Sequence, residues 1–206
     1  MTSLKFPGWV RWASVAWLAV WIPAYWRTWD AVNFLHVCDI AVLLTCAGLW
    51  WSNSLLLSSQ AVSSIAADLL WDLDAAWRLF AGHHLTGGTE YMWDARFALW
   101  VRLISLFHIV WPILLIWSLK RTGYDRRGWK LQSAIAAGAI VAGRFCNPAL
   151  NINFAFTDPL FHRALGPAPV HVLAIWLGFV VGLYLPTDLI LRKVLASRVL
   201  QPKIID

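Results

Sequence analysis

Six apolar stretches, each near the length that a helix needs to cross a bilayer, constrain the fold of this chain most strongly. A bilayer core is spanned by about 20 predominantly apolar residues in a helix. The candidate spans are Trp9–Trp26, Ala31–Trp51, Ser54–Ala81, Phe97–Leu119, Trp129–Cys146 and Val170–Leu191. They predict an all-α fold in which residues 1–206 form a single transmembrane domain, a bundle of six transmembrane helices.

The composition points the same way. Of the 206 residues, 60% are hydrophobic and 14% are charged, which argues against both a water-soluble globule and a disordered chain. Many of the 16 tryptophans fall near the ends of the apolar stretches, where an indole can lie between lipid and water. The net charge of +6 also gathers at these ends, which indicates attraction to membrane phospholipids rather than a groove for nucleic acid. The three cysteines, without paired spacing, predict no disulfide framework.

The distribution of lysine and arginine predicts the orientation. With six spans, both termini share one side with the loops that follow spans two and four. That side carries eleven basic residues and the other side carries four. The eleven are Lys5, Arg11, Lys120, Arg121, Arg126, Arg127, Lys130, Arg192, Lys193, Arg198 and Lys203. We therefore expect a multi-pass protein of the cell (inner) membrane with both termini in the cytoplasm, whose first span is retained rather than removed as a signal peptide.

The third stretch is the least regular of the six. Asp68, Asp72, Asp74 and Arg78 crowd its second half, so that half either leaves the membrane or turns toward the protein interior. The spacing of Asp74 and Arg78 is typical of an ion pair on a helix surface.

A metal site is one alternative for this region. Asp68 and Asp72 lie one turn apart on one helix face, His83 and His84 follow, and carboxylates with imidazoles can hold zinc. The spacing matches no HExxH-type pattern, so we expect no cofactor and interpret residues 83–90 as a flexible turn.

Polar groups at bilayer depth are costly and are usually functional. In a regular second span, His36 and Asp39 lie about 60° apart and share a face. An aspartate beside a histidine fixes the imidazole tautomer and stabilises the imidazolium. Cys38 projects about 160° from His36, so its thiol needs a base from another helix. The alternative is a buried His–Asp hydrogen bond beside a small cysteine that behaves as an apolar residue.

The fourth span contributes His108. Pro112 follows four residues later and removes the hydrogen bond to the His108 carbonyl, which predicts a kink beside a candidate general base. Arg102, two turns away, either binds a lipid phosphate or extends to the membrane interface.

The segment after the fifth span is rich in amides. Pro148 predicts that the helix ends near Asn147, and Asn151 and Asn153 follow at the same depth as His36 and Asp39. Their amides could line an oxyanion site or satisfy the backbone of the loop. Arg144, at the start of this segment, is a further candidate for substrate binding.

Four short motifs, taken in order, resemble those of a known family. Residues 34–41 (FLHVCDIA) look like the HxCD signature of the YwaF-type bacterial integral membrane proteins. The resemblance continues with Phe107–His108, with the asparagine-rich segment Asn147–Phe154 and with the LGPAP turn at Leu165–Pro169, and covers roughly residues 31–190.

The resemblance implies a relationship to an animal transmembrane acyltransferase of ether-phospholipid remodelling and, more distantly, to the androgen-induced-gene hydrolases of fatty-acid esters. It implies Cys38 as nucleophile and His108 as base. In the animal acyltransferase the cysteine directly precedes a histidine, whereas His36 here lies two residues before Cys38. The equivalent position is therefore either Cys38 or His36.

We expect an integral membrane enzyme, an acyltransferase or hydrolase, that acts on the acyl chains of membrane phospholipids. The candidate catalytic residues are His36, Cys38, Asp39 and His108, and the candidate substrate-binding residues are Arg102, Arg144, Asn147, Asn151 and Asn153. The alternatives are a zinc-dependent hydrolase that resembles the ceramidases, with zinc held by His36 and Asp39, alone or together with His108, and a lipid-binding or transport bundle without catalytic activity.

Overall fold

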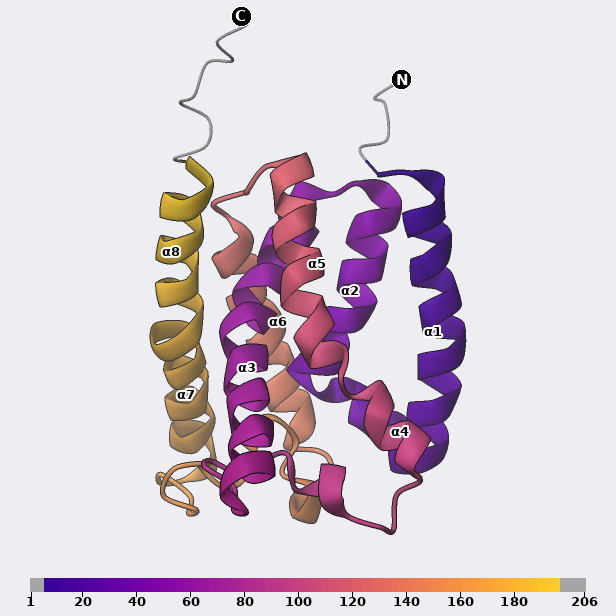
Figure 1. Cartoon of the computed structure of the whole chain (residues 1–206). Coiled ribbons are helices and arrows are strands. Elements are labelled where there is room, and N and C mark those ends of the chain that lie inside the picture. Colours follow the sequence, from indigo (N-terminus) through magenta and orange to yellow (C-terminus); the bar gives the residue numbers. More distant parts are fainter. Residues whose placement is uncertain (1–5, 197–206) are drawn as a thin grey trace, which may run out of the picture.

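Six helical rods that run alternately up and down make up the fold (Figure 1). The computed structural model describes residues 6–196, and among these it contains no strand. The rods are α1 (Gly8–Trp29); η1 (Ala31–Leu35) with α2 (Val37–Trp51); α3 (Ser54–Ala81); α4 (Leu99–Ile104) with α5 (Phe107–Thr122); α6 (Gly128–Gly143); and α7 (Ala168–Phe179) with η5 (Val180–Tyr184) and α8 (Leu185–Ala196). The predicted all-α class is confirmed, and each predicted stretch corresponds to one rod.

Fewer helices than the six predicted spans meet the criteria of length and hydropathy for crossing a membrane. Two helices, Leu99–Thr122 and Ala168–Leu195, are long and apolar enough to span a bilayer, and α2 is apolar but shorter. These two helices support association with a membrane. The bundle of six spans stays a prediction.

The third rod, α3, lies at the centre of the bundle. Its polar residues are one reason why it is not among the helices that are apolar enough to span a bilayer. α3 packs against α2, α5 and α6, and its inward side carries buried polar residues. These are Ser58, Ser59, Gln60, Ser63, Ser64, Asp68 and Asp74. The helix runs unbroken to Ala81, with Asp68 and Asp74 turned inward and leucines such as Leu69 and Leu73 turned outward. Of the two expectations for this stretch, the turn toward the protein interior is therefore confirmed.

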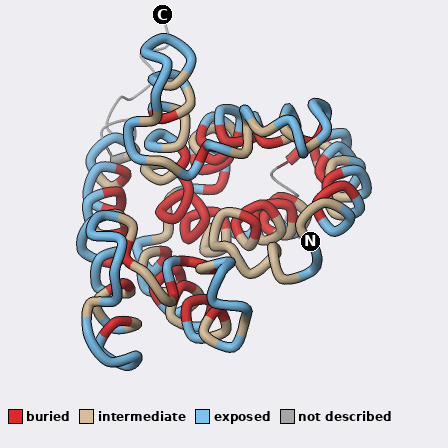
Figure 2. The backbone as a smooth tube through the Cα atoms, turned by 90° about the horizontal axis from the view of Figure 1, so that it is seen from below, coloured by how far each residue is buried: buried red, intermediate tan, exposed pale blue. Residues whose placement is uncertain are grey.

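An aromatic core connects the first, second and fourth rods. Trp21 is fully buried and contacts Tyr25, Phe34 and Phe107 at ring-centroid distances of 4.8, 5.2 and 6.3 Å. Figure 2, which looks along the bundle, shows buried residues on the inner sides of the helices and exposed residues on the outer sides. Phe107 immediately precedes His108, so this core fixes the start of α5, where a candidate catalytic residue lies.

Two helix interruptions differ from the predictions. The regular helix expected through His36 is wrong, because η1 ends at Leu35, His36 is extended (φ −61°, ψ 136°) and α2 begins at Val37. The fourth rod breaks between Ile104 and Phe107, about a turn before the predicted site, while Pro112 lies inside α5. The His108 N–H donates to the Ser105 carbonyl across this break at 3.2 Å.

The two ends of the bundle differ in their loops. The start of α1 and the end of α8 lie at the same end of the bundle as the short α2–α3 and α5–α6 connections, as an even number of rods requires (Figure 1). The long connections 82–98 and 144–167 lie at the opposite end, which we call the loop end. The end opposite the loop end carries the described basic residues that the sequence assigns to the terminal side: Arg11, Lys120, Arg121, Arg126, Arg127, Lys130, Arg192 and Lys193. Lys5, Arg198 and Lys203 lie outside the described residues.

Candidate functional site

A cavity of about 490 Å³ in the loop-end half of the bundle brings the four candidate catalytic residues together. His36, Cys38, Asp39 and His108 all line it, although they come from two different rods. Asn151 and Asn153, from the loop after α6, complete part of the wall. Residues from separate segments therefore meet in one pocket, while their catalytic roles stay a prediction.

The His108 imidazole has a carboxylate partner, Asp68, which the sequence suggested only as a possible zinc ligand. His108 Nδ1 lies 2.9 Å from Asp68 Oδ1, and the two side chains are 8% and 2% exposed. Trp71 stacks on the His108 ring at a centroid distance of 4.6 Å. With Nδ1 directed at a carboxylate, the ring is held in one orientation and Nε2 has no hydrogen-bond partner among the described residues. This is the geometry of an oriented general base.

Asp39 has different partners from those expected. Its Oδ2 accepts a hydrogen bond from Asn33 Nδ2 at 2.6 Å, and its Oδ1 lies 4.0 Å from the Cys38 thiol. The expected pairing of His36 with Asp39 rested on a regular helix, and His36 lies instead in the extended residue before α2. In the described structure the imidazole–carboxylate pair of the cavity is thus His108 with Asp68.

The three asparagine side chains hold backbone in place. Asn153 accepts from the Val37 N–H at 2.9 Å and donates to the Leu35 carbonyl at 2.8 Å, which ties its loop to the break before α2. Asn151 accepts from two backbone N–H groups, and Asn147, outside the cavity, accepts from the Ala149 N–H at 3.0 Å. Asn151 and Asn153 have positive φ angles of 42° and 51°, which asparagine tolerates better than most residues. These amides therefore satisfy loop backbone, while a role of theirs in substrate binding stays a prediction.

The two arginines considered for substrate binding do not line the cavity. Arg102 donates to the Met92 carbonyl at 2.8 Å. Arg144 donates to the Ala155 carbonyl at 3.1 Å, and its guanidinium lies 4.2 Å from the centroid of the Phe156 ring. Both side chains fasten loops at the loop end.

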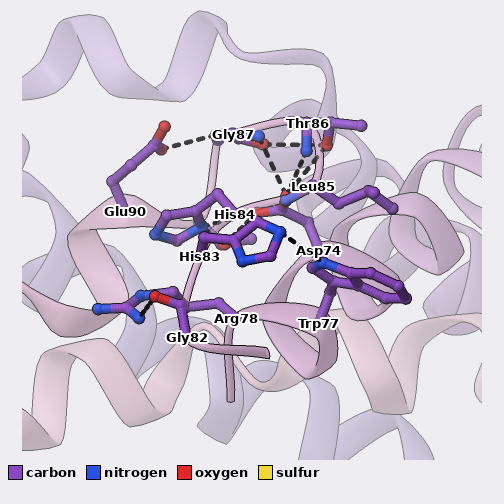
Figure 3. A network of polar contacts seen from close by, with 12 residues as sticks. Asp74, Trp77, Arg78, Gly82, His83, His84, Leu85, Thr86, Gly87 and Glu90 are labelled. Atoms are coloured by element: carbon purple, nitrogen blue, oxygen red, sulfur yellow. Dashed lines mark hydrogen bonds and ion pairs between the residues drawn. The ribbon is translucent and has the colours of Figure 1, made fainter. Parts of the chain in front are cut away.

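The segment expected as a flexible turn is instead anchored on a buried carboxylate (Figure 3). Asp74 Oδ1 accepts from the N–H groups of Leu85, Thr86 and Gly87 at 2.8, 2.6 and 3.0 Å. Its Oδ2 accepts from Thr89 and lies 3.0 Å from His84 Nδ1. The expected surface pair of Asp74 with Arg78 is wrong, because Asp74 is fully buried and Arg78 donates to the Gly82 carbonyl.

The anchored loop helps to form the site. Thr86, Gly87 and Gly88 line the cavity, so the Asp74 network positions one of its walls. His84 contacts Asp74 rather than Asp68 or Asp72. Within residues 6–196 no group of three or more His, Cys, Asp or Glu side chains is placed to hold a metal ion.

Tyr25 and Tyr91, two of the three tyrosines that line the cavity, were not identified from the sequence. Tyr25 shares a 2.7 Å hydrogen bond with Ser105 Oγ, and Tyr91 belongs to the short helix η2 (Glu90–Trp93). Burial raises the pKa of Tyr91, which keeps its phenol neutral and able to donate a hydrogen bond. No sequence pattern marks either tyrosine. Tyr25 lines the cavity because of how α1 packs, and Tyr91 because of how the loop after α3 packs.

No family model, curated protein or solved structure matches this chain.

Proposed function

We propose that this chain is an integral membrane enzyme that transfers or hydrolyses the acyl groups of lipids, with His108 as general base. The observation that carries the proposal is the 2.9 Å contact of His108 Nδ1 with the buried Asp68 carboxylate, at the wall of a cavity that also contains the Cys38 thiol. A base, its orienting carboxylate and a nucleophile are the components that nucleophilic acyl transfer requires.

Six membrane spans are part of this proposal. The outer faces of the rods carry large exposed apolar side chains, such as Val110 and Ile113 on α5 and Leu189 and Ile190 on α8. Their exposed fractions are 56%, 66%, 56% and 60%, as expected of helix faces that contact lipid. The polar residues of α3 face inward, which a helix in lipid requires. The excess of lysine and arginine at the terminal end favours cytoplasmic termini and a cavity near the outer leaflet.

The proposed chemistry has two steps. His108 Nε2 takes the thiol proton of Cys38, the thiolate sulfur bonds to the acyl carbonyl carbon, and the carbon–oxygen bond to the alcohol breaks. The imidazolium, stabilised by Asp68, returns the proton to the leaving alcohol. Water or the hydroxyl group of a lysolipid then attacks the thioester, its proton passes through His108 to the cysteine sulfur, and the free acid or the new ester is released. In this proposal the Tyr91 phenol, at the cavity wall, donates a hydrogen bond to the oxyanion.

One observation favours a second route for the same reaction class. The Asp39 carboxylate lies 4.0 Å from Cys38 Sγ, and a nearby negative charge opposes formation of a thiolate. In this route His108 activates water directly, and the carbonyl is hydrolysed without an acyl-enzyme intermediate.

Turnover of a long-chain acyl ester by the purified protein in neutral detergent tests the proposal. We expect His108→Gln to reduce kcat/KM roughly 100-fold or more, as loss of a general base does, whereas the exposed His83→Gln leaves it within about twofold. Equal activity of both variants would overturn the proposal. The two routes separate by intact mass, because an acyl adduct that Cys38→Ala abolishes and Cys146→Ala retains is expected of the thioester route alone.

A further inference from the structure

The wall of the cavity, as far as the structure describes it, contains two aspartates but no lysine or arginine. Asp39 and Asp68 are each 2% exposed, and both line the cavity. Within residues 6–196, no lysine or arginine contributes to this wall, and its basic side chains are the imidazoles of His36 and His108. Asp68 Oδ2 also has no hydrogen-bond partner in the described structure. A buried polar oxygen without a protein partner beside an open cavity is available to accept a hydrogen bond or a cation from a bound group.

The groups that could have received an anion are already occupied. Arg102 and Arg144 donate to backbone carbonyls of the loops and lie outside the cavity wall. Consecutive backbone N–H groups can cradle an anion, and the loop beside the cavity has such a run in Leu85, Thr86 and Gly87. All three of these N–H groups donate to Asp74 Oδ1 (Figure 3). A phosphate or carboxylate in the cavity would therefore meet two carboxylates and no lysine or arginine.

Aromatic side chains form one part of the remaining wall. Tyr25, Trp29 and Tyr91 form a continuous group, with ring centroids 4.7 Å apart for Tyr25 and Trp29 and 5.7 Å apart for Trp29 and Tyr91. Trp71 and Phe179 line the cavity as well. The faces of aromatic rings attract cations, and a group of such rings is a typical site for a quaternary ammonium ion.

From these observations we infer that the substrate of this site carries a cationic head group, an ammonium or quaternary ammonium, near the acyl carbonyl, rather than a phosphate or another acid. The carboxylate of Asp39 and the rings of Tyr25, Trp29 and Tyr91 hold the cation, while the acyl chain extends along the apolar part of the wall. The inference relies on the proposed acyl chemistry for the identity of the reacting bond. The charge preference itself can be measured by binding alone.

Three lauroyl esters with tetrahedral heads of similar size provide the test: the choline ester (positive), the 3,3-dimethylbutyl ester (neutral) and the isethionate ester (negative). We expect kcat/KM for the choline ester to exceed that for the neutral ester roughly tenfold, with the isethionate ester lowest. Asp39→Asn should bring the choline and neutral esters within about threefold of each other. Asp125→Asn, at the terminal end of the bundle, should retain the wild-type ratio.

Binding of the corresponding non-hydrolysable ethers in a neutral maltoside detergent separates the two claims. If the choline ether binds most tightly but no ester is cleaved, the acyl chemistry is overturned and the cationic preference is supported. If esters are cleaved without a preference for choline, or with isethionate preferred, the head-group inference is overturned and the acyl chemistry is supported.

Discussion

Removal of the Asp74 carboxylate should release the loop that follows α3. Its two oxygens receive three backbone N–H groups, the hydroxyl groups of Thr86 and Thr89, and His84, all within residues 84–89. A hydrogen bond to a charged group contributes about 1.5–3 kcal/mol, so six independent bonds would give a sum as large as the stability of a whole domain. Leu85 is 48% exposed, and the N–H groups can regain water when the loop opens. We therefore expect Asp74→Ala to cost about 3 kcal/mol, confined to this loop.

Hydrogen exchange of the amides of residues 85–87 measures this cost directly. A loss of about 3 kcal/mol accelerates their exchange more than 100-fold, while exchange in α1 and α2 stays unchanged. Asp74→Asn keeps one acceptor oxygen and should show a smaller effect, and Asp94→Ala, on the exposed loop surface, should show none there. Unchanged exchange at residues 85–87 in Asp74→Ala would refute the assignment of Asp74 as the anchor of the loop.

Three further changes test the packing and the charges. Gly128→Ala places a methyl group 2.8 Å from the backbone of α3 and should lower the unfolding free energy, measured by thermal unfolding, by about 1–3 kcal/mol. Gly138→Ala, where nothing lies within 4 Å of the added methyl group, should not destabilise the protein. Equal effects of the two variants would contradict this packing. Asn153→Ala removes two backbone hydrogen bonds before α2 and should cost about 2 kcal/mol by the same measurement; no loss would argue against that contact. Arg127 holds the pKa of Asp125 below its usual value, so the stabilisation is present above about pH 4 and is lost as the pH falls through the lowered pKa. Asp125→Asn should therefore remove a pH dependence of the unfolding free energy that amounts to less than about 1 kcal/mol over this acid range, and an unchanged slope would contradict it.

The helices of this fold follow from the sequence, because runs of apolar residues set where each rod begins and ends. The inward polar side of α3 was foreseeable as one of two outcomes, since Asp68 and Asp74 cannot remain charged in lipid without protein around them. The break before His36 was not foreseeable. It depends on Asn153, more than a hundred residues away, which ties down the backbone on both sides of the break.

The candidate site was predictable as a set of residues but not as a set of pairs. His36, Cys38, Asp39 and His108 share a cavity, as expected if polar groups in an apolar chain gather inside the bundle. The partner of His108 is Asp68, forty residues earlier, and no local spacing encodes that pair. The rotation of α3 and α5 about their axes decides it, and this rotation is set by packing. The same holds for Asp74, whose i+4 neighbour Arg78 suggested a surface pair that packing replaces with the loop network.

A double-mutant cycle on Asp68 and His108 tests the central claim most directly. If the carboxylate acts only by orienting the imidazole, the double variant Asp68→Asn/His108→Gln should have the same kcat/KM for a long-chain acyl ester as His108→Gln alone, roughly 100-fold or more below wild type. Losses that multiply in the double variant, or single variants that keep wild-type turnover, would show that this pair is not the catalytic unit of the site.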